Sequence, residues 1–237
     1  GRYVLGNATL DVNGTETIGR RGVGQFIHET TEIGFDHTVA GELLIGDEAG
    51  SEGTYNLRGS LSRSLLTVTG SEIIGRSGEG TFDQEGGTHT VTQQLTLGEQ
   101  ADGVGSYYLR SGTLSVTETP STGGIATLGR RGAGTIDQSG GDFVVRVFNL
   151  GSEFAGTGHY ILSDGNLSAD RVAVGLQNLS QGLVEQSGGE AVVAVLRLAS
   201  TGFPDQSAIG RYRLSGGVLE TTEAYIGQEG LGDFSHS

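Results

Sequence analysis

The sequence contains no cysteine, no lysine and no methionine, and only two of its 237 residues are proline. Without cysteine there is neither a disulfide framework nor a thiolate nucleophile, and without lysine there is no amine for Schiff-base chemistry. No stretch approaches the roughly 18 apolar residues of a membrane-spanning helix. Because the chain also lacks a start methionine and opens on nothing like a signal peptide, we expect a fragment or processed product of a longer protein.

Positive charge is also scarce, since 14 arginines stand against 28 acidic residues and give a formal net charge of −14. Binding a nucleic-acid backbone or an anionic membrane requires clustered positive charge. We therefore predict no nucleic-acid partner and no membrane span in this segment.

Glycine is present in excess, at 44 of 237 residues, against a usual share of about 7%. There is no three-residue glycine period, which excludes collagen, and the scarcity of proline argues against a proline-rich disordered tract. Valine, isoleucine and leucine instead recur at fixed intervals. The glycines are therefore expected in the turns of a repeat array, whose core is a stack of small contributions.

Two repeat units alternate along the chain. Type A reads Gly-x-Tyr-x-Leu and begins at Gly1, Gly53, Gly105, Gly158 and Gly210. Type B, in its clearest form Gly-x-Phe-x-Gln-x-Gly-Gly, begins at Gly24, Gly80, Gly134, Gly182 and Gly232. Short alternating runs broken by glycine are typical of strands with one buried face. We predict an all-β parallel β-solenoid with about nine coils of 22–29 residues and three strands per coil, forming one domain over residues 1–237 without a cap at either end.

The first strand of each coil supplies two inward columns. The first is a core aromatic ladder of Tyr3, Phe26, Tyr55, Phe82, Tyr107, Tyr160, Tyr212 and Phe234. Two residues later, type A coils have leucine, and type B coils have a buried amide ladder of Gln84, Gln138 and Gln186, with His28 and His236 in the same position. Each buried amide needs partners, for which the backbone of the following Gly-Gly turn is the best candidate.

Apolar columns are also expected on the other two strands. For the second strand we assign Leu10, Leu61, Leu114, Leu167 and Leu219 in type A coils, and Val91, Val145 and Val193 in type B coils. The third strand ends on an apolar residue that glycine usually follows. Glu16 and Glu72 interrupt the apolar pattern of this strand, and the sequence offers no explanation for them.

The repeat consensus, clearest at residues 80–87 and 105–114, resembles the Gly-rich repeats of bacterial autotransporter passengers and related surface adhesins. The resemblance covers the whole chain. It implies a right-handed parallel β-helix, exported and displayed at the cell surface, often without enzymatic activity. No fixed catalytic residue belongs to the motif, so none is transferred to this sequence.

A ladder of alternating charge is predicted where each third strand ends. Successive coils place Arg20, Asp47, Arg76, Glu99 and Arg130 directly after the glycine of that strand. Stacked about 4.8 Å apart, opposite charges would form cross-strand ion pairs, each contributing roughly 0.2–1 kcal/mol. The alternative is an anion or acidic-sugar site that adds Arg21 and Arg131, because guanidinium groups bind carboxylates bidentately.

Other polar residues do not form a recognisable site. Asp83, Asp137 and Glu185 share an outward column, two coils or about 9.6 Å apart, which is too far for shared Ca²⁺ ligation and only touches the range of inverting glycosidases. The five histidines are scattered, and the Thr15/Thr17, Thr90/Thr92 and Thr117/Thr119 pairs give no regular ice-binding array. We predict no catalytic residue, metal site or cofactor.

These observations favour a non-catalytic structural or adhesive segment of an exported bacterial surface protein. Its expected partners are protein or glycan surfaces, or other copies of the chain through the uncapped ends, in an extracellular or cell-surface location. One alternative is a polysaccharide lyase or glycoside hydrolase of the pectate-lyase-like β-helix type, which rests on fold analogy alone. Another is a self-assembling fibre subunit.

Overall fold

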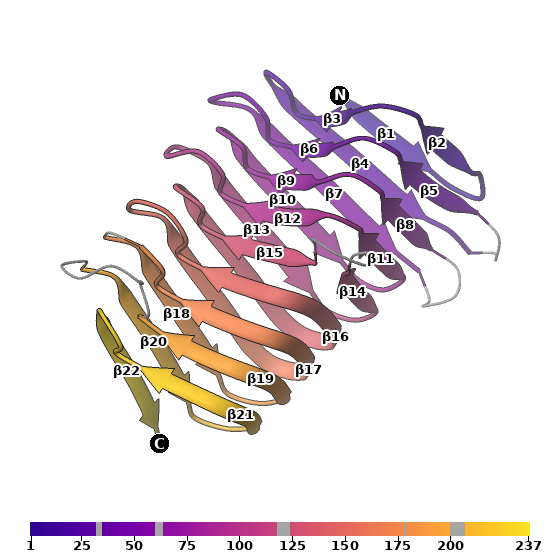
Figure 1. Cartoon of the computed structure of the whole chain (residues 1–237). Coiled ribbons are helices and arrows are strands. Elements are labelled where there is room, and N and C mark those ends of the chain that lie inside the picture. Colours follow the sequence, from indigo (N-terminus) through magenta and orange to yellow (C-terminus); the bar gives the residue numbers. More distant parts are fainter. Residues whose placement is uncertain (32–34, 60–63, 118–123, 178, 200–206) are drawn as a thin grey trace.

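The computed structural model describes residues 1–31, 35–59, 64–117, 124–177, 179–199 and 207–237. These residues form 22 β-strands and no helix, and the parallel strands stack as a β-solenoid of about nine turns, with the termini at opposite ends of the stack (Figure 1). The predicted fold class is confirmed. Consistent with this, the described part of the chain holds no helix that is long and apolar enough to cross a bilayer.

Coils are numbered here from the N-terminus, each beginning at the glycine of its repeat. Coils 1–5 each contain three separate strands, namely β1 (Arg2–Leu5), β2 (Leu10–Val12), β3 (Glu16–Ile18), β4 (Val23–Glu29), β5 (Asp36–Val39), β6 (Leu43–Ile45), β7 (Glu52–Arg58), β8 (Leu65–Val68), β9 (Glu72–Ile74), β10 (Glu79–Gln84), β11 (Thr88–Val91), β12 (Gln94–Leu97), β13 (Val104–Leu109), β14 (Thr113–Val116) and β15 (Ile125–Leu128). From coil 6 onward the segments join into longer strands, namely β16 (Ala133–Leu150), β17 (Thr157–Val174), β18 (Gln181–Gln186), β19 (Glu190–Leu198), β20 (Ile209–Leu214), β21 (Val218–Ile226) and β22 (Leu231–His236).

The corner between the second and third strands explains why these two strands join from coil 6 onward. In coils 1–3 three residues separate the last inward residue of the second strand from the first inward residue of the third strand. The middle one is glycine, as at Gly41 and Gly70. A Cβ on Gly70 would lie 2.1 Å from the carbonyl oxygen of Gly41, so the chains approach too closely there for any side chain. In coils 6–9 the corner has two residues, such as Asp170 and Arg171, and hydrogen bonding continues through it.

The first-strand columns lie in register from end to end. Phe26 pairs with Tyr55, Tyr55 with Phe82, and Phe82 with Tyr107, and the ring centroids of these pairs are 4.9, 4.8 and 4.7 Å apart. Ile136 then interrupts the stack. The aromatic rings between the ends are buried, and together with the leucines they form the centre of the core.

The second strand corrects one assignment made from the sequence. Leu10, Leu114, Leu167 and Leu219 do share a column, but coil 3 contributes Leu66, while Leu61 lies outside the described residues. Val91, Val145 and Val193 belong to a separate column two residues further on. Both columns point inward because residues i and i+2 of a strand face the same side. In type B coils the leucine column holds His37, His89, Phe143 and Ala191.

Candidate functional site

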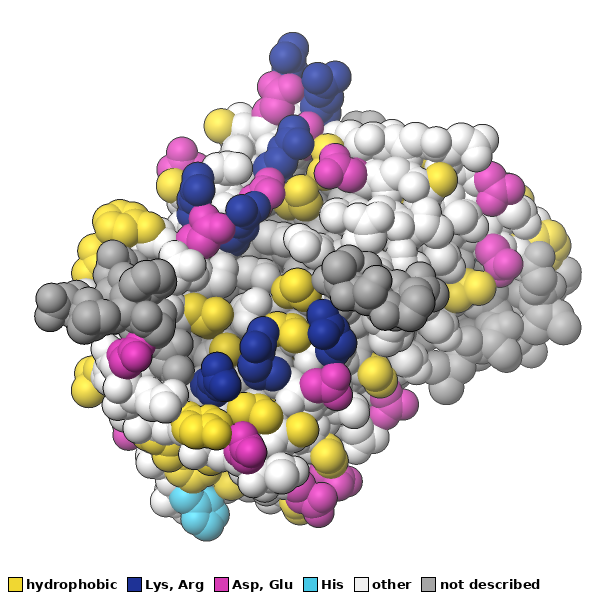
Figure 2. Space-filling model, viewed as in Figure 1, with side chains coloured by type: hydrophobic (Ala, Val, Ile, Leu, Met, Phe, Trp, Pro, Cys, Tyr) yellow, Lys and Arg dark blue, Asp and Glu magenta, His cyan; other side chains and the backbone are white. Residues whose placement is uncertain are grey.

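The predicted charge ladder occupies the turns that follow the third strands. The backbone amides of Asp47, Arg76, Glu99 and Arg130 each donate to the carbonyl of the corresponding glycine one coil earlier, at 3.0 to 3.1 Å. Basic and acidic side chains alternate along the upper edge of the molecule in Figure 2. The five predicted positions are therefore stacked in register.

The side chains pair less regularly than the backbone. Arg76 forms an ion pair with Asp47, and Arg130 lies 3.4 Å from Glu99. Arg20, however, reaches Glu48 at 3.3 Å instead of Asp47. An arginine side chain is long enough to reach either of two adjacent acids, so the sequence could not decide between them.

Two acids that the sequence reasoning missed hold the paired arginines. Glu48 binds both Arg20 and Arg21, and Glu153 binds Arg130 and Arg131, each at 2.7 Å. The hydrogen bond from Arg21 lowers the pKa of Glu48 below its usual range. Because the arginines of the proposed anion site are already engaged by acids of the same chain, this geometry disfavours that alternative.

The acids of the outward column on the stacked first strands do not form a common site either. Asp83 accepts a hydrogen bond from Arg110 at 2.9 Å, and Tyr108 separates it from Asp137 in the register. Glu185 lies 2.9 Å from His159 and accepts a hydrogen bond from Arg213 at 3.1 Å.

The pKa of Glu185 also argues against acid catalysis. Burial raises it, but the hydrogen bonds with His159 and Arg213 outweigh burial and lower the pKa below its usual range. A glycosidase acid needs the opposite shift. Within the described ranges, no three His, Asp or Glu side chains are grouped closely enough to hold a metal ion.

The buried amides bind tyrosines of the following coil. Tyr107 donates to the side-chain oxygen of Gln84 at 2.5 Å, and Tyr160 donates to that of Gln138 at 2.6 Å. The third pair, Tyr212 and Gln186, has the same geometry. Each amide nitrogen donates to the carbonyl of the second glycine of its turn and to a carbonyl of the next coil, so these groups are fully used within the core.

Glu16 and Glu72 belong to buried polar clusters that the sequence reasoning missed. The first polar cluster consists of Glu16, His37, Tyr55 and His28, and the second polar cluster consists of Glu72, His89, Tyr107 and Gln84. In both, the glutamate oxygen lies 2.8 Å from the histidine Nε2. Each set is drawn from three successive coils. The one available signal was the recurrence of a glutamate, a histidine and a tyrosine at similar offsets, 18 residues separating His from Tyr in both.

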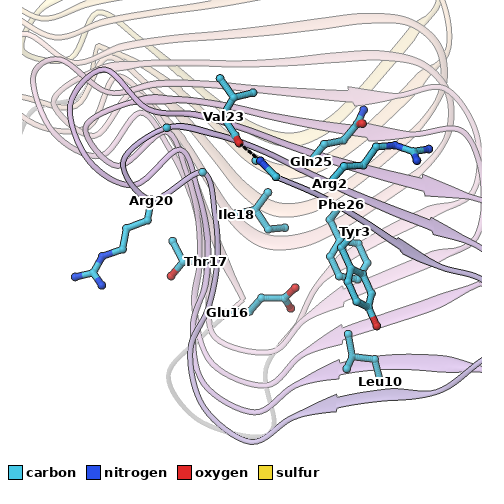
Figure 3. A pocket seen from close by; sticks show the side chains of 14 residues that line it. Arg2, Tyr3, Leu10, Glu16, Thr17, Ile18, Arg20, Val23, Gln25 and Phe26 are labelled. Atoms are coloured by element: carbon cyan, nitrogen blue, oxygen red, sulfur yellow. Dashed lines mark hydrogen bonds between the residues drawn. The ribbon is translucent and has the colours of Figure 1, made fainter.

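The first polar cluster borders a cavity of about 530 Å³ at the N-terminal end of the stack. Figure 3 shows Glu16 pointing from β3 toward the stacked rings of Tyr3 and Phe26, while Arg20 points away from the cavity. Among the described residues that line it, Glu16 is the sole carboxylate. The cavity therefore offers no pair of acids for general acid–base hydrolysis.

An uncharged face covers the outer side of the stacked second strands in coils 3–5. Its nine outward positions are Leu65, Thr67, Thr69, Thr88, Thr90, Thr92, Thr113, Ser115 and Thr117. We call this the hydroxyl face. Thr67, Thr90 and Ser115 are neighbours in the register, alternating along their strands with buried residues that are apolar except for His89. Of the threonine pairs considered from sequence, Thr90/Thr92 and Thr117 belong to this face, whereas Thr119 lies outside the described residues.

Comparisons of the chain with protein-family models, with curated proteins and with solved structures found no match. The functional interpretation therefore depends on the geometry described above and on the resemblance of the repeats.

Proposed function

We propose that this chain is a non-catalytic structural or adhesive segment of an exported bacterial surface protein, located at the cell surface. One observation carries the proposal. In the described coils, the acids of the charge ladder and its turns, and Asp83 and Glu185 of the outward column, are paired with arginines. The two polar clusters consist of buried or nearly buried side chains, and among these residues no nucleophile, base and oxyanion donor converge on a common point. A stiff rod with paired surface charges is suited to spacing and to contact.

Within this proposal, the hydroxyl face is the favoured contact surface, and a neutral glycan is its favoured partner. Eight of its nine positions carry hydroxyl groups and none is charged, although the chain as a whole carries a formal charge of −14. Hydroxyls both donate and accept hydrogen bonds, as sugar hydroxyls do. β-Branched threonine is restricted at χ1, so little side-chain entropy is lost when a partner binds.

The test is binding of the purified chain to an array of neutral and acidic glycans. We expect selective binding to neutral glycans. Thr90→Lys should weaken it about tenfold or more, because an unpaired ammonium must be desolvated at the centre of the face. The matched control is Ser168→Lys, which adds the same charge to the same outward column in coil 7 and should leave binding unchanged.

Three results would contradict the proposal. Binding that is equally weakened by both variants would remove the hydroxyl face as the contact surface. Absence of binding to any glycan or cell-surface protein would remove the adhesive role. Release of oligosaccharides from a polysaccharide by the chain would favour the carbohydrate-active enzyme instead.

A further inference from the structure

The two polar clusters are equivalent at every position but one. His28 and Gln84 occupy the same place in their type B coils, facing Tyr55 and Tyr107. The His37 Nδ1 to Tyr55 hydroxyl distance is 2.8 Å, and the corresponding distance from His89 to Tyr107 is 3.0 Å. The clusters therefore form a natural comparison of histidine with glutamine in one buried site.

Gln84 determines the direction of hydrogen bonding in the second polar cluster. Its amide nitrogen donates to two backbone carbonyls, so its oxygen faces Tyr107 and can only accept. Tyr107 must donate to that oxygen, and its own oxygen then accepts from Nδ1 of His89. The remaining proton is shared between His89 and Glu72, so this cluster is neutral overall whichever of the two holds it.

The first polar cluster differs because its last member can accept a proton. If His37 donates to Tyr55 as His89 does to Tyr107, Tyr55 donates to Nδ1 of His28, which is then neutral with its proton on Nε2. That nitrogen has no hydrogen-bond partner within the described residues, and the His28 side chain is fully buried. A second proton on His28 would point an N–H at the hydroxyl that now donates to it, and would place net positive charge in the core.

Among the described residues, no free acid faces His28 to compensate that charge. The titratable groups facing His28 are Tyr55 from β7, His37 from β5 and, beyond His37, Glu16 from β3. Glu16 is already paired with His37, whose ring centroid lies 6.0 Å from that of His28. Leu5 and Leu57 occupy the same column in the coils on either side.

We propose that His28 makes the N-terminal coils an acid-opened element of the solenoid. Protonation of His28 disrupts the first polar cluster and loosens coils 1–3, whereas the coils that have glutamine in this position stay stacked. This inference does not depend on the proposed function.

The direction of the pH effect follows from linkage. Burial, followed by the neighbouring His37, lowers the pKa of His28 from about 6.5 to about 4. The unfolded coils therefore bind more protons than the folded ones between these two values, and stability is lost as pH falls through that window. The shift corresponds to a change of about 300-fold in the opening equilibrium from well above pH 6.5 to well below pH 4, of which about 80-fold falls between pH 6.5 and pH 4.

Hydrogen exchange of the full chain, resolved by peptide and corrected for intrinsic rates at each pH, tests the proposal. In the wild type we expect amides of β4, β5 and β7 to lose protection as pH falls from about 6.5 to about 4, and those of β16 and β17 to keep it. His28→Gln, which copies the second cluster, should abolish the acid-dependent loss. Gln84→His should transfer the loss to coils 4 and 5.

Two outcomes would overturn the proposal. One is the same acid-dependent loss in His28→Gln as in the wild type, with equal protection of both proteins at neutral pH. The other needs no variant: an NMR titration in which the His28 ring protons report an ordinary histidine pKa would show that the buried ring carries no penalty for protonation.

Discussion

Coils 1–5 and coils 6–9 fill equivalent core positions with different chemistry. Next along the array, Glu72 and His89 are replaced by Ala126, on the third strand of coil 5, and by Phe143 of coil 6, so the change begins within coil 5. In the following unit the same two positions hold Val172 and Ala191. Carboxylate and imidazole are present together or absent together. This comparison of the two regions indicates that the glutamate and the histidine depend on each other, because either one alone would leave a buried charge or an unpaired polar group.

The corner geometry follows this division in part. The three-residue corners with central glycine occur in coils 1–3, and coil 4 has Gln93 at the centre of its corner, whereas the two-residue corners of coils 6–9 enclose apolar contacts. In coil 6, for example, Phe148 packs edge-on against Phe143 and Tyr160, with ring centroids 5.2 Å apart in both pairs. The tyrosine–glutamine pair is common to both regions, so it is the constant feature to which the Glu–His pair is added.

The largest expected effect comes from breaking one Glu–His pair. Glu72→Ala leaves His89 without its partner in a fully buried site, which should lower the free energy of unfolding by about 3–5 kcal/mol. The double variant Glu72→Ala/His89→Phe copies coils 5 and 6 and should recover most of that loss. Urea unfolding of the two variants is the measurement. If the double variant is less stable than the single one, the two regions are not interchangeable at these positions.

A smaller effect is expected at the corner. Gly70→Ala places a Cβ 2.1 Å from the carbonyl oxygen of Gly41, and the backbone shift that relieves the overlap should cost about 1–3 kcal/mol. Asp170→Ala, at the two-residue corner of coil 7, is the matched control and should be nearly neutral. Equal unfolding midpoints for both variants would remove the corner as a distinguishing feature.

The constant tyrosine–glutamine pair should be equally important in both regions. Gln138→Leu removes the acceptor of the buried Tyr160 hydroxyl and should cost about 1–3 kcal/mol. Adding Tyr160→Phe should restore part of the loss, since the buried hydroxyl that lost its acceptor is then absent. Gln84→Leu, with and without Tyr107→Phe, repeats the measurement in coils 4 and 5. A clearly larger loss there would mean that the Glu–His pair stiffens the whole cluster.

The smallest effect is expected on the outer surface. Glu153→Gln removes the acid shared by Arg130 and Arg131 and should cost less than about 1 kcal/mol, with the cost falling as salt is added. Glu48→Gln is its counterpart in coil 2. A loss of several kcal/mol, or one insensitive to salt, would show that these turns are part of the structural core.

The features that were best predicted from the sequence are those that recur within each coil. A glycine followed two residues later by an aromatic marks eight of the ten first strands, with Ile136 and Val184 in the other two, so the fold class and the aromatic column could be derived without a structure. The second strand of coil 3 was misassigned because residues 59–66 offer leucines at three positions, and the length of the preceding loop cannot be read from them. Neighbouring coils decide which of those leucines is buried.

The candidate sites were harder to predict because their members come from different coils. Glu72 and His89 are 17 residues apart and lie on different sheets, so their contact depends on how the sheets meet across the core. Asp47 and Glu48 are adjacent in sequence, and the length and direction of each arginine side chain determine which of the two acids it contacts. The register between stacked strands can be derived from the repeat. Contacts across the core can be known only from how the strands of one coil are placed relative to one another in space.

The alternation of two coil types has a consequence for how such a chain can change its length. Tyr55, Tyr107, Tyr160 and Tyr212 each meet a glutamine or histidine of the preceding coil. Glu16 and Glu72 each meet a histidine of the following coil. Loss or duplication of one coil would bring two coils of the same type together and leave these partners mismatched. Loss or duplication of a type A and type B pair, such as residues 53–104, preserves every junction. A doublet of one type A coil and one type B coil is therefore the smallest change in length that keeps these buried partners matched.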